Sequence, residues 1–98
     1  MILVTGSVVA RADTLENIRD LSLAHVRRSR AEPGCLSHSV HADCENPLKL
    51  VFVEQWADAA ALRAHFAVPA SRAFVRAIRA LAAEETEMFV YEAVQITP

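Results

Sequence analysis

Glycine and cysteine are both scarce, with only two of each among the 98 residues. Phosphate-binding loops and dinucleotide-binding turns need several closely spaced glycines, so neither can be built here. Cys35 and Cys44 are too few for a disulfide framework, and the sequence contains no CxxC or HExxH motif. We therefore expect no metal site, no bound cofactor, and free thiols of the kind found in the reducing cytoplasm.

Charge of one sign and long apolar runs are also lacking. The formal net charge is −2 and no basic block is present, which gives no electrostatic support for a nucleic-acid or anionic-membrane partner. The apolar runs are far shorter than the roughly 18 residues of a membrane span. The apolar N-terminal segment lacks the basic region of a signal peptide, so we interpret it as a strand and expect a cytoplasmic protein.

What the chain does have is an excess of apolar residues. Hydrophobic side chains make up 53% of only 98 residues, a length that predicts one domain over residues 1–98. A domain of this size buries roughly 60–65% of the surface of its unfolded chain, which leaves a monomer marginally stable. Burial of apolar surface between two copies is the simplest way to accommodate the excess, so the composition predicts association.

The hydrophobic periodicity predicts the order strand, helix, strand, strand, helix, helix, strand. Turn chemistry separates the segments: Glu32-Pro33-Gly34 ends the first helix, and Pro69 suits the first position of the last one. The predicted strands and helices cover Met1–Ala10, Leu15–Ala31, Cys35–Asp43, Leu48–Trp56, Ala59–Val68, Pro69–Ala83 and Glu87–Ile96.

The first helix has two candidate N-caps and an unusual inward stripe. Thr14 can cap it with a weak box to Asn17, and the alternative is Asp13 with Glu16. At 100° per residue one stripe collects both apolar and polar side chains. Polar groups on a buried stripe indicate the edge of a cavity, and the alternative is a stripe that drifts to the surface with His25 exposed. The stripe contains Leu15, Ile18, Ser22, His25, Val26 and Ser29.

The strand Leu48–Trp56 is apolar on both faces in its middle, so we expect it to be covered on both sides. The order βαββαβ, with the second helix broken at Pro69, predicts an α+β ferredoxin-like fold with a four-stranded antiparallel sheet. Helices cover only one face of such a sheet. The other face, which carries Val51 and Val53, is therefore expected to pack against a second copy and form a homodimer.

Three segments carry a resemblance to a known family: EPGCLSH at 32–38, FVEQW at 52–56 and ADAAALRAHFAVPASRAF at 57–74. They resemble the antibiotic biosynthesis monooxygenases, and within that family the quinol monooxygenase-like proteins. The resemblance covers nearly the whole chain and implies a dimeric α+β barrel. Ala70 and Phe74 stand where relatives often carry histidine and tyrosine. The site residues typical of the haem-degrading branch are mostly absent from this sequence.

The resemblance implies cofactor-independent oxidation of a quinol-like or polycyclic aromatic substrate by O₂. Glu54 and Trp56 match the family's E-x-W, and His65 matches the histidine of the next helix, so we expect these three as catalytic residues. A histidine suits the base, and an indole suits the orientation of an aromatic ring. As substrate-binding residues we expect His25, His38, Phe52, Phe66 and Phe74.

Plainer interpretations remain open for the same residues. Trp56 and His65 also fit core packing, and Glu54 fits a structural hydrogen bond. Arg72, Arg76 and Arg79 fall on an outward helical face and are expected to be solvated. The alternatives for the function are a ligand-binding or stress-associated dimeric barrel without turnover, or an isomerase in the same pocket.

Overall fold

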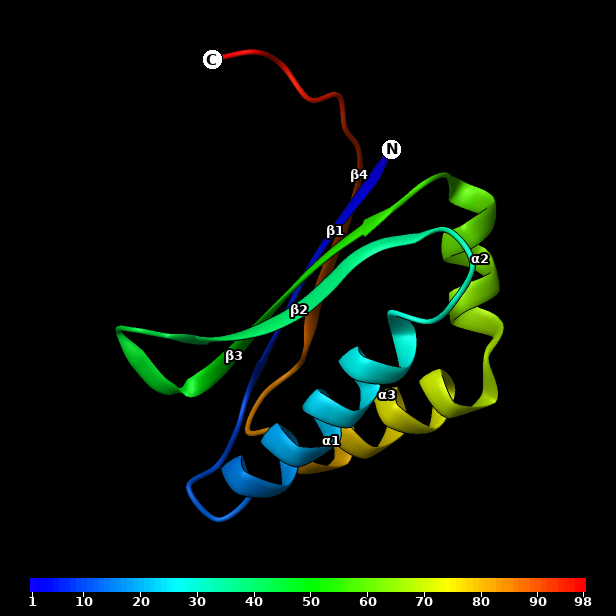
Figure 1. Ribbon diagram of the computed structural model, residues 1–98. Helices are drawn as coiled ribbons and strands as arrows, with labels where there is room; N and C mark the ends of the chain where they lie inside the picture. Colours follow the sequence, from blue (N-terminus) through cyan, green and yellow to red (C-terminus); the bar gives the residue numbers. More distant parts are fainter.

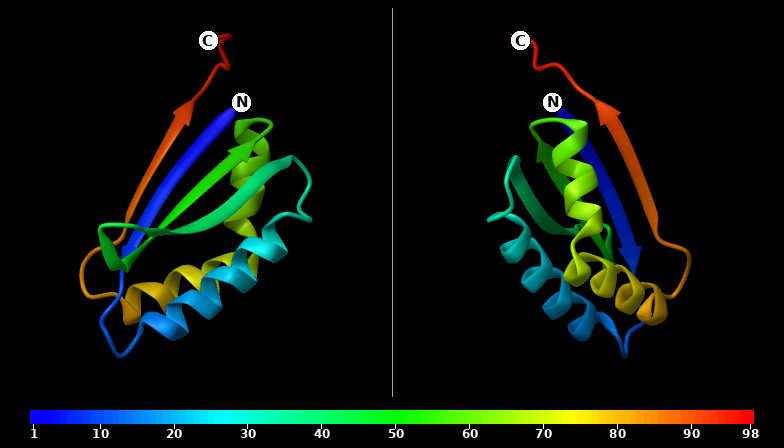
Figure 2. Two further views of the ribbon diagram at one scale, coloured as in Figure 1. Left: turned by 60° about the vertical axis from the view of Figure 1, so that its left-hand side comes forward. Right: turned by 90° about the vertical axis from the view of Figure 1, so that its right-hand side faces the viewer.

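A four-stranded antiparallel sheet covered by helices on one face makes up the protein (Figures 1 and 2). The computed structural model describes all residues from 1 to 98. The order along the chain is β1 (Ile2–Val9), α1 (Leu15–Ser29), β2 (Cys35–Asp43), β3 (Asn46–Trp56), α2 (Ala59–Ala67), α3 (Pro69–Leu81) and β4 (Glu87–Glu92). This βαββααβ order confirms the predicted α+β ferredoxin-like fold.

The sheet order is β2-β3-β1-β4, which places β3 and β1 at the centre. Alternate residues of β3 face the helices, and the register sets Glu54 opposite Val4 of β1 and His38 of β2. The core lies between this face and the helices. Its fully buried side chains include Val4, Val8, Ile18, Val26 and Trp56.

Several element ends differ from the sequence prediction. Helix α1 ends at Ser29 rather than Ala31, because the chain turns toward Gly34. Strand β4 ends at Glu92 rather than Ile96, because its last contacts with the neighbouring strand are the hydrogen bonds between Ala93 and Met1, just beyond the Ile2–Glu92 pair. None of the three helices combines the length and apolar character that a membrane crossing requires.

Neither predicted N-cap box forms at α1. Thr14 holds the N-cap position without a side-chain cap hydrogen bond. Its hydroxyl instead donates to the carbonyl oxygen of Leu81 at 2.8 Å and accepts from the backbone N–H of Arg11 at 3.0 Å. The hydroxyl that was expected to cap α1 therefore forms its hydrogen bond with the end of α3 instead. The cap predicted at Asp58 does form, since its carboxylate accepts from the N–H of Ala61 at 2.8 Å.

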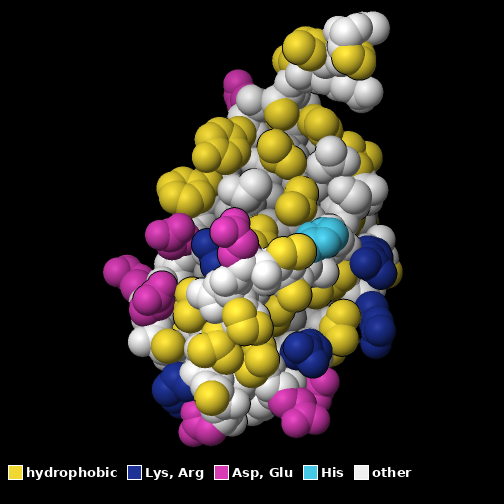
Figure 3. Space-filling model, turned by 90° about the vertical axis from the view of Figure 1, so that its left-hand side faces the viewer, with side chains coloured by type: hydrophobic (Ala, Val, Ile, Leu, Met, Phe, Trp, Pro, Cys, Tyr) yellow, Lys and Arg dark blue, Asp and Glu magenta, His cyan; other side chains and the backbone are white.

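The helix-free face of the sheet leaves apolar side chains in contact with solvent. Phe89 and Tyr91 of β4 are 51% and 49% exposed, and Val51 and Val53 of β3 are half-buried. Figure 3, viewed from the side opposite α2, shows hydrophobic side chains spread over the upper part of the molecule. A single copy does not cover this face.

Gly34 is the position where the fold requires glycine. Its φ is +81°, and a Cβ there would lie 2.5 Å from the Cβ of Ala61. We expect Gly34→Ala to lower the free energy of unfolding by more than the roughly 1–2 kcal/mol of the left-handed conformation alone. Urea denaturation measures the loss. Gly6→Ala is the control: Gly6 lies in a strand at negative φ, so its effect should stay within about 1 kcal/mol. Equal losses in both variants would contradict this account.

Candidate active site

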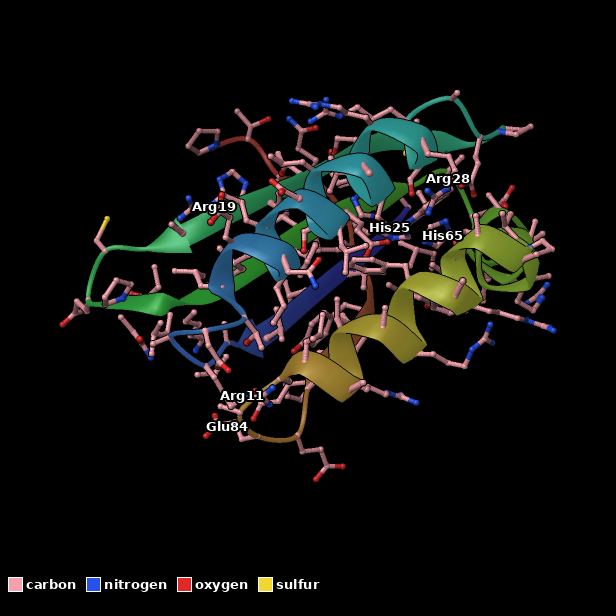
Figure 4. The ribbon with its side chains drawn as sticks, turned by 90° about the horizontal axis from the view of Figure 1, so that it is seen from below. Arg11, Arg19, His25, Arg28, His65 and Glu84 are labelled. Carbon is pink, nitrogen blue, oxygen red and sulfur yellow. The ribbon has the colours of Figure 1, made fainter.

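Three histidines from three different elements meet between the sheet and the helices. His25 of α1, His38 of β2 and His65 of α2 are each at least 95% buried. Their ring centroids lie 5.2 Å (25–38), 5.3 Å (25–65) and 5.6 Å (38–65) apart. Figure 4 shows His25 and His65 directed into the same space, with Arg28 beside them. Buried imidazoles this close are unusual for a simple core, which makes this the candidate site.

Each histidine reaches the site for a local reason. His25 lies on the inward stripe of α1 between the buried Ser22 and Ser29, so the periodicity interpretation is right and the surface alternative is wrong. His38 reaches the site through strand register, because its cross-strand partner is Glu54. His65 and Leu62 are the buried residues of α2.

Glu54 is the common neighbour of the cluster. Its Oε1 accepts the indole N–H of Trp56 at 2.9 Å and lies 3.3 Å from Nε2 of His38 and 4.0 Å from Nε2 of His65. Burial alone would raise the pKa of this carboxyl, but His38, the indole N–H and His65 outweigh burial and hold the pKa below its usual value. Glu54 is therefore a buried carboxylate anion at neutral pH.

His65 is oriented by a second carboxylate. Its Nδ1 lies 2.9 Å from Oε1 of Glu32, in the turn after α1. Because a carboxylate accepts only, Nδ1 carries the proton in the neutral ring and Nε2 has a free lone pair. The Nε2 side faces Glu54. This arrangement makes His65 a proton acceptor with negative charge on both sides.

His25 has the opposite tautomer. Nη2 of Arg28 lies 3.0 Å from its Nδ1, and a guanidinium only donates, so Nδ1 accepts and Nε2 carries the proton. The ring stacks on Phe74 with centroids 4.0 Å apart and planes at 6°. Burial, followed by the charges of His38, His65 and Arg28, lowers the pKa of His25 to about 3. His25 is thus a neutral hydrogen-bond donor at physiological pH.

A cavity of about 510 Å³ opens beside these groups, within the usual range for small-molecule sites. Six of the residues predicted for the site line it: His25, Phe52, Glu54, His65, Phe66 and Phe74. Trp56 and His38 do not line the cavity. Trp56 is fully buried with its indole N–H bound to Glu54, so the stacking on substrate expected from the sequence has no support in this geometry. Trp56 and His38 instead support Glu54.

The histidine cluster raises the question of a metal ion. His25, His38 and His65 each offer a nitrogen, and these atoms lie within 4.8 Å of one another. Zinc–nitrogen bonds of about 2.0–2.1 Å require ligand nitrogens roughly 3.3 Å apart in a tetrahedral site. The guanidinium of Arg28 also adds positive charge beside His25. Nδ1 of His25 and Nδ1 of His65 are already hydrogen-bonded to Arg28 and Glu32, so only Nε2 of each of these two rings is free to act as a ligand.

Sequence reasoning missed Glu32 and Arg28 as members of the site. The sequence places Glu32 in a turn and in the segment EPGCLSH but assigns it no role at the site, although the turn brings it to His65, 33 positions away in the sequence. Arg28 follows His25 by three residues, which is the spacing of neighbours on a helix and could have indicated the contact.

The low pKa of His25 predicts a pH dependence of stability. The unfolded chain protonates this imidazole near pH 6.5, whereas the folded protein does so only near pH 3. As the pH falls from about 6.5 toward 3, the unfolded state gains a proton that the folded state does not, so the free energy of unfolding decreases. In His25→Phe, the urea midpoint should fall less steeply over this range. The control is Arg19→Gln, which changes an exposed residue of α1 outside the cavity and should keep the wild-type slope. Parallel curves for His25→Phe and wild type would contradict the prediction.

A known protein is similar in sequence to this chain over most of its length. An uncharacterised protein of Synechocystis sp. is 34% identical over 91 residues, which cover 93% of this chain and 62% of the relative. The chain thus spans less than two thirds of that relative's length.

Solved structures agree with the fold along the whole chain. A protein of Deinococcus radiodurans, described as a candidate antibiotic biosynthesis monooxygenase, superimposes with a TM-score of 0.94 at 26% identity, covering 100% of this chain and 97% of the other. The crystal structure of an antibiotic biosynthesis monooxygenase gives 0.89 at 27% identity, with 97% and 100% coverage. The sequence profile of the family described as antibiotic biosynthesis monooxygenase matches residues 1–77. The chain belongs to the antibiotic biosynthesis monooxygenase family, in the dimeric α+β barrel superfamily.

Proposed function

We propose that the protein is a cofactor-independent monooxygenase that oxidises a quinol-like aromatic substrate with O₂. Family membership supports the reaction class. The observation that carries the proposal is the pair of opposite tautomers, His65 with a free Nε2 and His25 with a protonated Nε2, at one cavity. One imidazole can remove a proton while the other donates a hydrogen bond to the anion that forms.

The first step is deprotonation of the substrate hydroxyl by His65. The proton moves to Nε2, and the resulting cation lies between the carboxylates of Glu32 and Glu54. Nε2–H of His25 stabilises the substrate oxyanion, and its low pKa keeps the ring neutral throughout. Phe52, Phe66 and Phe74 provide apolar and aromatic walls against which a flat ring can pack.

The electrons for oxygen reduction come from the substrate itself. The anion transfers one electron to O₂, and the two radicals combine at a ring carbon to form a peroxide. The O–O bond then breaks as that carbon loses its hydrogen as a proton, so one oxygen atom stays as a carbonyl and the other leaves as water. A naphthohydroquinone would give a hydroxynaphthoquinone and one water for each O₂ consumed. This route needs no metal, flavin or haem.

A homodimer is part of the proposal. Proteins of this family typically form dimeric α+β barrels. The helix-free face gives the surface that a second copy would bury, since its apolar side chains are exposed at Phe89 and Tyr91 and half-buried at Val51 and Val53. The free thiols of Cys35 and Cys44 suit the cytoplasmic location proposed for this dimer.

Oxygen uptake tests the proposed reaction. Protein treated with EDTA should accelerate O₂ consumption by a naphthohydroquinone above the buffer rate. His65→Gln should lower the turnover number by about a hundredfold or more, because it removes the base. Glu32→Gln retains an acceptor for Nδ1 but loses the charge, so it should give a smaller loss and a shifted pH–rate profile.

Two outcomes would overturn the proposal. A rate equal to buffer alone would exclude this substrate class. Release of one hydrogen peroxide per O₂, measured by oxygen return on adding catalase, would indicate electron transfer without insertion of oxygen. Arg19→Gln, at an exposed position of α1 outside the cavity, supplies the control and should retain full activity.

Light scattering during gel filtration tests the dimer. We expect a mass of about 22 kDa, twice the 10.8 kDa of one chain. Phe89→Lys should convert the protein to a monomer, because it places a charge in the apolar surface. Val90→Lys is the matched control, since Val90 is exposed to the same degree (50% against 51%) but points to the other face of β4. A wild-type monomer at micromolar concentration would contradict the interface.

A further inference from the structure

The outer stripe of α3 follows the rim of the cavity. Arg72, Arg76 and Arg79 are spaced by four and three residues, so they project from one side of the helix. Sequence reasoning expected solvated side chains. All three are indeed exposed, but they also line the cavity that contains His25 and His65. With a rise of 1.5 Å per residue, the stripe is about 10 Å long, the length of a two-ring aromatic molecule.

None of the three guanidinium groups has an acidic partner. The ion pairs of the chain join Arg11 to Asp13, and His38 and His65 to Glu32 or Glu54. Arg72 donates one hydrogen bond from Nε to the carbonyl oxygen of Phe66 at 3.3 Å, which leaves its terminal nitrogens free. Glu54 and Glu87 also line the cavity, but neither lies within 4.0 Å of these arginines. The rim therefore carries three arginines without an ion-pair partner, and of these only Arg79 also lines a neighbouring pocket with Glu84 and Glu85.

A second observation at the same wall is independent of the arginines. Ser71 lines the cavity and is 97% buried, and its hydroxyl has no hydrogen-bond partner. Buried hydroxyl groups are almost always hydrogen-bonded, so one without a partner, in a residue of the cavity wall, favours a ligand oxygen as its partner after rotation of the side chain. Ser71 directly precedes Arg72 and lies on the same first turn of α3. Ser71 and Arg72 therefore contribute to the same stretch of the cavity wall.

We infer that this wall binds the carboxylate of an aromatic hydroxy acid, which narrows the substrate class of the proposed function and rests on it. The carboxylate would accept hydrogen bonds from Ser71 and from the guanidinium groups of Arg72 and Arg76, which suit its planar, bidentate geometry. The ring would lie along Phe74, and its hydroxyl would reach His25 and His65. Glu87 repels an anion, which favours the Ser71 end of the stripe over the β4 end.

Calorimetric titration with two matched ligands tests the carboxylate site without requiring turnover. 1-Hydroxy-2-naphthoate and 1-naphthol share the ring system and the hydroxyl, and only the first carries a carboxylate. Under argon, the acid should bind about tenfold more tightly or better, and added salt should weaken only the acid. Replacing both Arg72 and Arg76 by glutamine should abolish the difference, while Ser71→Ala should reduce it several-fold.

Arg19→Gln is the control, because Arg19 is exposed on α1 and lies outside the cavity. It should bind both ligands like the wild type. Equal affinity of the wild type for acid and naphthol, or unchanged acid binding by the doubly substituted protein, would overturn the carboxylate site. Tighter acid binding without O₂ uptake by any substrate would leave the site standing and remove the oxidation, so the two proposals fail separately. Circular dichroism of each variant establishes that it is folded.

Discussion

A single buried negative charge, that of Glu54, governs the arrangement of this site. A carboxylate under a helical layer is costly unless donors and opposite charges surround it. The indole of Trp56 supplies one donor, and two imidazoles approach the same oxygen. Since these groups come from the end of β3, from β2 and from α2, satisfying one carboxylate fixes the relative positions of three elements. The aromatic cluster at this end of the sheet is therefore organised around charge rather than around apolar packing.

The two histidines at the cavity carry their protons on different ring nitrogens, because side chains of opposite charge contact them. Both rings are buried and both face the same space. A carboxylate behind His65 and a guanidinium behind His25 give the rings opposite tautomers, so one accepts and the other donates. The chemistry thus depends on Glu32 and Arg28 as much as on the imidazoles, although neither side chain needs to touch a substrate.

The sequence allowed the element order, the sheet face of β3 and the inward position of His25 to be predicted, because all of these follow from periodicities of 2 and 3.6 residues. The end of β4 and the bond of Thr14 to Leu81 were missed because they depend on segments far away in the chain, whereas the end of α1 depends on the turn that leads to Gly34. At the site, Glu54 and His65 were identified through the family resemblance. The positions of Glu32 and of the α3 arginines beside the cavity depend on how the helices pack on the sheet. A single sequence does not determine that packing.

The bond between Thr14 and Leu81 has a mechanical consequence. Together with the hydrogen bond from Arg11 to Ala82 and the bridge of Ala10 to Ala82, it pins the start of α1 to the end of α3. At the opposite end, the stacked rings of His25 and Phe74 hold the two helices together. The same end of α1 is also held by the hydrogen bond from Nε of Arg30 to the carbonyl oxygen of His38 in β2, and by the bond of Glu32 to His65 in α2. Helix α1 is thus tied at both ends, so the wall that it gives to the cavity is held in place by its neighbours on both sides.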